Sequence, residues 1–275
     1  REVRRLSIDA VADLHDVLRT KVLRFFFKLW GIRVAVIDKG RKEKQELTSR
    51  RAKVLRPLRS SFERYGEVFV SLGVSFVPNF VSLYDEGVGD EGLYSELTPP
   101  KSSGERWIGV APFAKHKGKI YPLDRMEKVV SKLSEESRVK IFLFGSGDRE
   151  REILSLWRER YPGVISLADK RYGFAVELSL MSRLDVMISM DSANMHLASL
   201  VEVPVVSVWG ATHPYCGFLG WRQSDSGVVE LPLDCRPCSV FGNKPCYRKD
   251  YACLEIAPET IVDRVKSLET LIKEK

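Results

Sequence analysis

From residue 107 to residue 209 the sequence alternates short β-rich runs with amphipathic segments, and this alternation limits the fold more than any other feature. The β-rich runs are mostly apolar, as expected for strands that are buried on both faces of a sheet. Alternation of this kind predicts an α/β fold with a doubly wound parallel sheet and right-handed crossovers. We predict strands over residues 107–111, 139–144, 164–167, 186–189 and 205–209, and helices over 123–136, 148–160, 174–181 and 193–201.

The sequence before this region is organised differently. A basic amphipathic segment over residues 17–30 precedes a β-rich run at 34–37, which predicts a helix packed on a strand. Residues 78–100 carry three glycines and several prolines without sustained periodicity, which indicates a long connection.

Two domains follow from this division, over residues 1–100 and 101–275, and the second ends in a helix that begins at Pro258. Because the first residue is Arg1 and not Met, we expect the N-terminal domain to be incomplete in this chain. No apolar run approaches the roughly 20 residues that a spanning helix needs. The predicted location is the cytoplasm.

Positive charge is concentrated between Arg19 and Arg64, a stretch that contains 15 Lys and Arg residues and four Asp and Glu residues. Such a stretch attracts anions, and charge alone does not distinguish nucleic acid, acidic lipid headgroups and phosphorylated glycans. A second interpretation is the solvated face of two basic helices. The segment Phe25–Trp30 adds aromatic residues, which packing in a core also explains.

Polar residues follow several of the predicted strands, and ligands of open α/β sheets bind at the carboxyl ends of strands. The loop over residues 115–119 is rich in cations, and lysine is suited to the oxygens of a diphosphate. Residues 145–148, Gly-Ser-Gly-Asp, would let backbone N–H groups approach an anion or a ribose. An exposed basic loop and a simple connector are the alternatives.

The most informative run is Met-Asp-Ser-Ala-Asn-Met-His-Leu-Ala over residues 190–198, after the fourth predicted strand. Asp191 is placed to cap the following helix, so a carboxylate, helix N–H groups and the imidazole of His196 would converge. Capping alone explains Asp191 and Ser192. It does not explain His196, for which a satisfied core histidine is the alternative.

These residues resemble the motifs of the heptosyltransferase family. The family pattern is Asp-Thr/Ser-Gly-Pro-x-His-Leu/Ile-Ala, then Val-Pro, then Gly-x-Thr-x-Pro. Two further segments are similar to its Lys-x-Trp-Pro and Asp-Leu-His motifs. In chain order the matching segments are Asp13–His15, Lys119–Pro122, Asp191–Ala198, Val203–Pro204 and Trp209–Pro214.

The resemblance implies a GT-B architecture of two Rossmann-like domains, with a nucleotide-sugar donor held by the C-terminal one. It implies that Lys119 contacts the donor phosphates and that Asp191 and His196 lie beside the donor sugar and diphosphate. By the same analogy the other donor-binding residues are Gly145, Ser192, Ala193 and Thr212. No cofactor is required, because Lys119 and a helix N-terminus replace a divalent ion.

The implied activity is transfer of a sugar, by default heptose from ADP-heptose, to an acceptor of the lipopolysaccharide-core type, with inversion. The acceptor implies peripheral association with the inner-membrane face. Ala193 and Asn194 replace the usual Gly-Pro of the family, which alters the edge of the donor pocket. The N-terminal Gly-Asp loop, with its catalytic Asp, has no counterpart, and we expect that Asp upstream of Arg1.

Two other functions remain open. Sugar-nucleotide epimerases of GT-B shape also bind a nucleoside diphosphate, although they need more catalytic acids in the N-terminal domain. A nucleic-acid-binding module would combine the basic stretch with a zinc site. It is disfavoured, because basic and aromatic residues interleave only at Phe25–Trp30.

Four of the five cysteines lie near the C-terminus in the spacing C-x2-C-x7-C-x6-C, a set suited to a closed, structural zinc site. Family members often carry cysteines in this region. Packing as small hydrophobic residues and pairing as disulfides are the alternatives. Cys216 stands apart and is expected to pack in the core. The four candidate ligands are Cys235, Cys238, Cys246 and Cys253.

Overall fold

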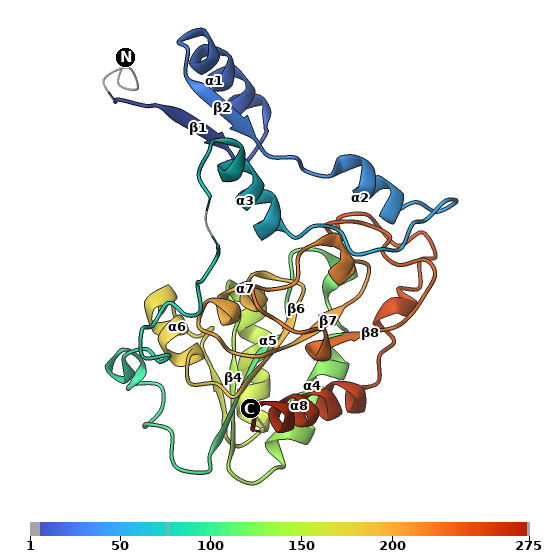
Figure 1. Cartoon of the computed structure of the whole chain (residues 1–275). Coiled ribbons are helices and arrows are strands. Elements are labelled where there is room, and N and C mark those ends of the chain that lie inside the picture. Colours follow the sequence, from blue (N-terminus) through green and yellow to red (C-terminus); the bar gives the residue numbers. More distant parts are fainter. Residues whose placement is uncertain (1–5, 76, 274–275) are drawn as a thin grey trace. The chain divides into compact units, whose positions relative to one another are not determined.

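The computed structural model describes residues 6–75 and 77–273. The chain divides into two compact units (Figure 1): Arg1–Phe80 with Tyr215–Phe218, and Val81–Pro214 with Leu219–Lys275. The division comes earlier than the boundary near residue 100 that the glycines suggest. The connection after Phe80 belongs to the second unit because it bonds there.

Three contacts hold this connection on the second unit. The N–H group of Leu83 donates to the carbonyl of Leu200 at 2.8 Å. The N–H group of Gly89 donates to Oγ of Ser182, also at 2.8 Å. The buried ring of Tyr94 packs edge-on against Trp107.

The first unit contains a parallel two-stranded sheet and three helices. Strands β1 and β2 pair in parallel. Helix α1 connects them, as parallel strands require a crossover, and the three elements form a βαβ unit. We did not predict β1, whose four residues are mostly half-buried. The elements are β1 (Ala10–Asp13), α1 (Leu18–Leu29), β2 (Arg33–Val36), α2 (Arg41–Leu47) and α3 (Ser61–Ser71).

Several cations of the basic stretch are bound inside this unit. The guanidinium of Arg64 is 2% exposed and is ion-paired with Glu43. Arg24 lies 3.3 Å from Asp13, and Arg59 bonds to Glu67 at 2.6 Å. The interpretation as a solvated basic face therefore fails for Arg24 and Arg64, whereas Arg59 is paired at the surface.

The second unit is built on a six-stranded parallel sheet in the order β5-β4-β3-β6-β7-β8. The five predicted strands are all present. The elements over residues 148–160, 174–181 and 205–209 have the predicted bounds. The sixth strand, β8, lies at the edge beside β7 and was not predicted. The strands are β3 (Arg106–Ala111), β4 (Val139–Leu143), β5 (Val164–Ser166), β6 (Val186–Met190), β7 (Val205–Trp209) and β8 (Val228–Glu230).

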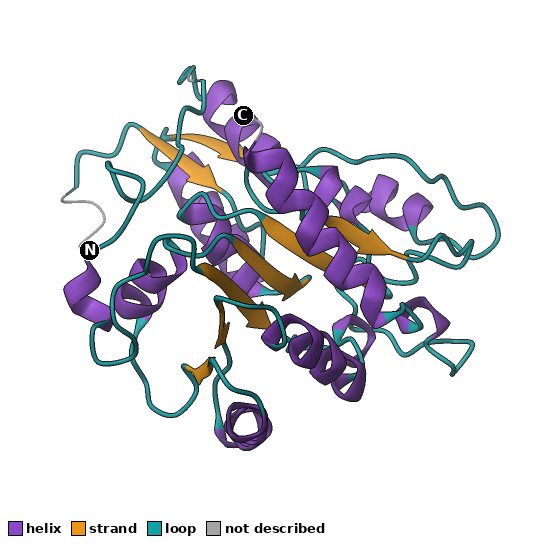
Figure 2. Ribbon diagram, turned by 90° about the horizontal axis from the view of Figure 1, so that it is seen from below, coloured by secondary structure: helices purple, strands orange, loops and turns teal. Residues whose placement is uncertain are grey.

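Helices cover both faces of this sheet (Figure 2). Helix α4 buries Met126, Val129, Val130 and Leu133, as the helical spacing predicts, and it packs against α8. Helices α6 and α7 contact each other. The doubly wound prediction is thus confirmed. The helices are α4 (Leu123–Ser134), α5 (Asp148–Arg160), α6 (Phe174–Met181), α7 (Ala193–Leu200) and α8 (Pro258–Lys273).

Short 3-10 turns complete the chain. They are η2 (Glu91–Tyr94), η3 (Lys117–Lys119), η4 (Pro214–Cys216), η5 (Asp225–Gly227) and η6 (Ala252–Leu254). Within residues 6–75 and 77–273, no helix is both long and apolar enough to cross a membrane.

Candidate functional site

The strand order of the second unit creates a switch point between β3 and β6. From β3 the chain proceeds outward through β4 and β5, and from β6 it proceeds the other way through β7 and β8. In open sheets of this kind ligands bind at the carboxyl ends of strands beside such a point. The lysine-rich loop follows β3 and Asp191 follows β6, so the two motifs flank the switch point.

The turn η3 holds Lys119 in place at this edge. The carbonyl of Gly118 accepts a hydrogen bond from the N–H group of Ala211 at 2.8 Å. Two residues after Lys119, the fully buried Tyr121 donates its hydroxyl hydrogen to the carbonyl of Ile256 at 2.7 Å. The loop is therefore docked on the end of β7 and on the segment before α8, and it is not a free basic loop.

Asp191 is the meeting point of two other motif residues. Its Oδ2 atom lies 2.9 Å from Nζ of Lys119 and accepts a hydrogen bond from the hydroxyl of Thr212 at 2.8 Å. The side chain of Asp191 is 6% exposed and that of Lys119 is 15% exposed. The sequence-predicted residues Lys119, Asp191 and Thr212 are thus brought together.

The predicted capping role of Asp191 is wrong. The residue at the N-cap of α7 is Ser192, and no side chain caps this helix end. Asp191 instead turns its carboxylate to Lys119 and Thr212. Oγ of Ser192 lies 3.3 Å from Oγ of Ser189. The side chain of Ser192 makes no cap hydrogen bond, and the backbone N–H groups of the first turn, from Ala193 on, carry the positive end of the helix dipole.

His196 lies one turn into α7, and the charges of Asp191 and Lys119 both affect its pKa. Burial lowers its pKa below the ordinary 6.5, the charge of Asp191 opposes this shift, and the charge of Lys119 adds to it. At neutral pH the ring is therefore the uncharged imidazole. His196 is partly exposed, so it is not a fully enclosed core histidine.

Gly145 lies at the carboxyl end of β4, and its lack of a side chain has a packing reason. A Cβ atom there would lie 2.9 Å from Cδ1 of Leu154 and 3.3 Å from the ring of Phe113. The next N–H group, of Ser146, donates to Glu150 at 2.8 Å. The turn thus satisfies one of its own donors, and a role for Gly145 in donor binding stays a prediction.

Thr212 is fully buried, so its side chain acts on Asp191 and does not line an open pocket. Sequence reasoning missed a group of residues behind it. Nε2 of His213 lies 3.2 Å from Oε1 of Glu230, whose Oε2 accepts from the guanidinium of Arg236 at 2.8 Å. Burial raises the pKa of Glu230, but the bond from His213 and the charge of Arg236 together lower it.

The four C-terminal cysteines occupy one neighbourhood without forming a ligand set. In the described part of the chain, no three His, Cys, Asp or Glu side chains are grouped to hold a metal ion. Burial raises the pKa of Cys253 to about 11, and the nearby thiols of Cys238, Cys235 and Cys246 add to the rise. The Sγ atom of Cys246 lies 3.9 Å from Oδ1 of Asp250. Cys216 is buried, as expected.

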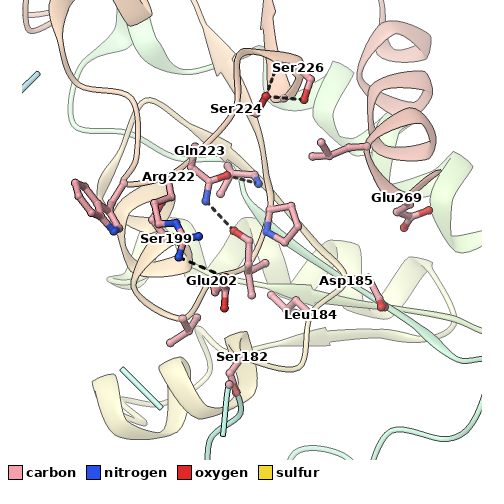
Figure 3. Close-up of a pocket in the computed structure, with 18 of the residues that line it drawn as sticks. Ser182, Leu184, Asp185, Ser199, Glu202, Arg222, Gln223, Ser224, Ser226 and Glu269 are labelled. Carbon is pink, nitrogen blue, oxygen red and sulfur yellow. Dashed lines mark hydrogen bonds and ion pairs between the residues drawn. The ribbon is translucent and has the colours of Figure 1, made fainter. Parts of the chain in front are cut away.

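A cavity of about 870 Å³ lies at the opposite edge of the sheet, by the amino ends of β6, β7 and β8 (Figure 3). Its lining includes Asp185, Glu202, Arg222, Gln223 and Glu269. The side chain of Gln223 bonds the backbone of Val203 and Val205, and Arg222 lies 3.7 Å from Glu202. None of the sequence-predicted site residues is among those that line this cavity.

Comparison with known proteins identifies the family and the fold class of the chain. A lipooligosaccharide heptosyltransferase 2 of Campylobacter jejuni is 25% identical over 172 residues, which are 61% of this chain and 53% of that protein. The chain thus spans about half the length of this curated relative. A family 9 glycosyltransferase of Veillonella parvula is similar in structure, with a TM-score of 0.69 and 18% identity over 98% of this chain and 76% of that one.

The heptosyltransferase WaaC of E. coli, solved with ADP, has a TM-score of 0.63 and 15% identity, over 96% of this chain and 74% of that one. These likenesses confirm the GT-B fold class expected from the motifs. The sequence model of glycosyltransferase family 9 (heptosyltransferase) matches residues 1–246. The chain belongs to glycosyltransferase family 9, the heptosyltransferases.

Proposed function

We propose that this chain supplies the donor site of an inverting glycosyltransferase that moves heptose from ADP-heptose to an acceptor of the lipopolysaccharide-core type. The observation that carries the proposal is the cluster of Lys119, Asp191 and Thr212 beside the N-terminus of α7, at the switch point of the sheet. The names of its relatives, which include a heptosyltransferase solved with ADP, support the choice of donor.

The chemistry of the cluster suits a leaving nucleoside diphosphate. The developing negative charge would meet the ammonium of Lys119 and the N–H groups of Ser192 and Ala193 at the start of α7. Asp191 keeps Lys119 oriented while no donor is bound. The uncharged His196 can donate or accept one hydrogen bond to the sugar or the diphosphate. A carboxylate from the rest of the enzyme would deprotonate the acceptor hydroxyl.

This proposal is favoured over the two alternatives. An epimerase would need further catalytic acids, and the buried carboxylate of Asp13 is held by Arg24 and by the N–H groups of His15 and Asp16. A nucleic-acid-binding module would need the cations of the basic stretch at the surface. Two of them, Arg24 and Arg64, are instead bound by carboxylates inside the first unit.

The acceptor side suggests peripheral attachment to an anionic membrane. Helix α1 has no buried residue, and it exposes Phe25, Phe26 and Trp30 beside its basic side chains. Aromatic and basic residues on one helix are typical of interfacial binding. We infer that this helix faces the lipid-linked acceptor or the inner leaflet.

The four cysteines are proposed to hold a structural metal ion, for which thiolates favour zinc. As placed, the side chains do not form a ligand set. Their shared neighbourhood around Cys253 supports the proposal. Such an ion would stiffen the loop, and the transfer reaction does not require it.

Isothermal calorimetry with ADP and ADP-heptose tests the donor site directly. The wild-type chain should bind both ligands without added divalent ion, whereas Asp191→Ala and His196→Ala should bind ADP-heptose more weakly. Arg222→Lys, at the opposite edge of the sheet, is the matched control. Unchanged affinity and turnover in both site variants would remove the assignment.

A further inference from the structure

The most completely buried cation of the second unit is not one of the donor-site residues. Arg236 lies between two of the cysteines and is 2% exposed. A guanidinium cannot be deprotonated in a protein, so its burial is tolerated only where oxygen atoms surround it. These oxygen atoms show what the residue does.

The guanidinium binds the carboxyl end of β7. Its Nε donates to the carbonyl of Gly210 at 2.6 Å, and its Nη2 lies within hydrogen-bond distance of the carbonyls of Trp209, at 3.1 Å, and Thr212, at 3.0 Å. Its Nη1 donates to the carbonyl of Leu231 at 2.6 Å. Three carbonyl groups at and just after the end of β7 are thus held by a single planar group.

One carboxylate completes this set. Oε2 of Glu230 accepts from Nη2 of Arg236 at 2.8 Å, and the other oxygen of Glu230 lies 3.2 Å from His213. Glu230 therefore neutralises the buried guanidinium and also contacts the residue after Thr212. Arg236 and Glu230, the last residue of the edge strand β8, together hold residues 209–213.

The cysteine-containing loop is fastened to the same segment by its backbone. The N–H group of Cys238 donates to the carbonyl of Ala211 at 2.9 Å, and the N–H group of Ala211 donates to the carbonyl of Gly118. Gly118 directly precedes Lys119. At Gly242 of the same loop, a Cβ atom would lie 2.5 Å from Cγ of Lys119. The loop thus lies directly behind both Thr212 and Lys119.

We propose that Arg236 is a positioning residue of the donor site: it holds the carbonyl groups at the end of β7, and so keeps the hydroxyl of Thr212 on Asp191. This inference rests on the proposed function. The chain of contacts runs from Arg236 through the backbone at Thr212 to Asp191, and from Asp191 to Lys119. Arg236 is buried, so it acts through these contacts.

Arg236→Lys is the informative change. Lysine keeps the charge but has one ammonium group in place of the planar fork, so it cannot serve Gly210, Leu231 and Glu230 together. We expect ADP to bind at least about tenfold more weakly, which corresponds to about 1.4 kcal/mol. Arg222→Lys, an exposed arginine that is paired with Glu202, should leave ADP binding unchanged.

A double-mutant cycle separates positioning from general stability. If Arg236 acts through Thr212, Arg236→Lys in a Thr212→Val background should weaken ADP binding little beyond Thr212→Val alone. Additive losses, or an Arg236→Lys chain that is less stable to urea yet binds ADP with wild-type affinity, would overturn the proposal. Failure of the wild-type chain to bind ADP would instead overturn the proposed function, and the positioning role with it.

If Arg236→Lys does not fold, Glu230→Gln decides the question. The change keeps the shape of residue 230 and removes the charge that neutralises Arg236. Weaker ADP binding in a chain with a cooperative urea transition supports the positioning role. Wild-type binding by Glu230→Gln overturns it.

Discussion

Nζ of Lys119 lies 2.9 Å from Oδ2 of Asp191, although the two residues come from loops after different strands of the sheet. The pair is largely buried, so both charges have lost most of their water and depend on each other. Thr212 satisfies the same carboxylate oxygen from a third strand end. In the proposed donor site, a diphosphate would bind a lysine that Asp191 already orients.

The first prediction concerns this lysine. Lys119→Ala should weaken the binding of ADP by about 1.5–3 kcal/mol, the range for a hydrogen bond to a charged group. Adenosine has no phosphates and should bind the variant and the wild type equally. Calorimetry with both ligands measures the difference. An equal loss for adenosine would mean that Lys119 does not contact the phosphates.

The convergence of these residues could be predicted because it follows from topology. Parallel strands end at one edge of a sheet, and the apolar periodicity around β3, β6 and β7 was strong enough to identify all three strands. The residues after them therefore had to meet. The contact between Asp191 and Thr212, in contrast, depends on side-chain orientation, and helix capping was the wrong inference for Asp191.

Two strands and one arginine escaped prediction for different reasons. β1 and β8 are short and each ends at an acidic residue, so neither continues into the longer apolar run that would mark a strand. Arg236 looks like a surface residue in sequence, because charged residues are seldom fully buried. Only the folded backbone brings the carbonyls of Gly210 and Leu231 to its guanidinium.

The second prediction concerns pH. Burial holds the pKa of His196 below 6.5 in the folded chain, so just below pH 6.5 the unfolded chain binds more protons than the folded one. The stabilising contribution of the neutral ring is complete above pH 6.5 and is lost as the pH falls. His196→Gln should therefore show a smaller drop in the free energy of unfolding between pH 7.5 and pH 5, by urea titration. Identical drops in the two proteins would contradict this.

The third prediction concerns the membrane. Vesicles that contain anionic lipid should bind the chain at low salt and release it as salt rises, because exposed charges are screened over about 8 Å at physiological ionic strength. Phe25→Ser, at a side chain that is 65% exposed, should weaken binding without lowering stability. Co-sedimentation measures both effects, with neutral vesicles as the control. Salt-insensitive sedimentation, or none, would count against the surface.

The fourth prediction concerns the cysteines. Thiolates bind zinc and thiols do not, so binding must release the protons that burial now favours on Cys253, whose pKa is raised to about 11. Cys246, whose Sγ lies 3.9 Å from Asp250, would have to leave that carboxylate to bind the ion. Zinc would then close the loop from Cys235 to Cys253 and stabilise the segment that carries Arg236. Protein purified without chelator should contain about one equivalent of metal by elemental analysis, and Cys246→Ser should lose it. A metal content near zero, together with four freely reactive thiols, would remove the metal and leave the donor site as proposed.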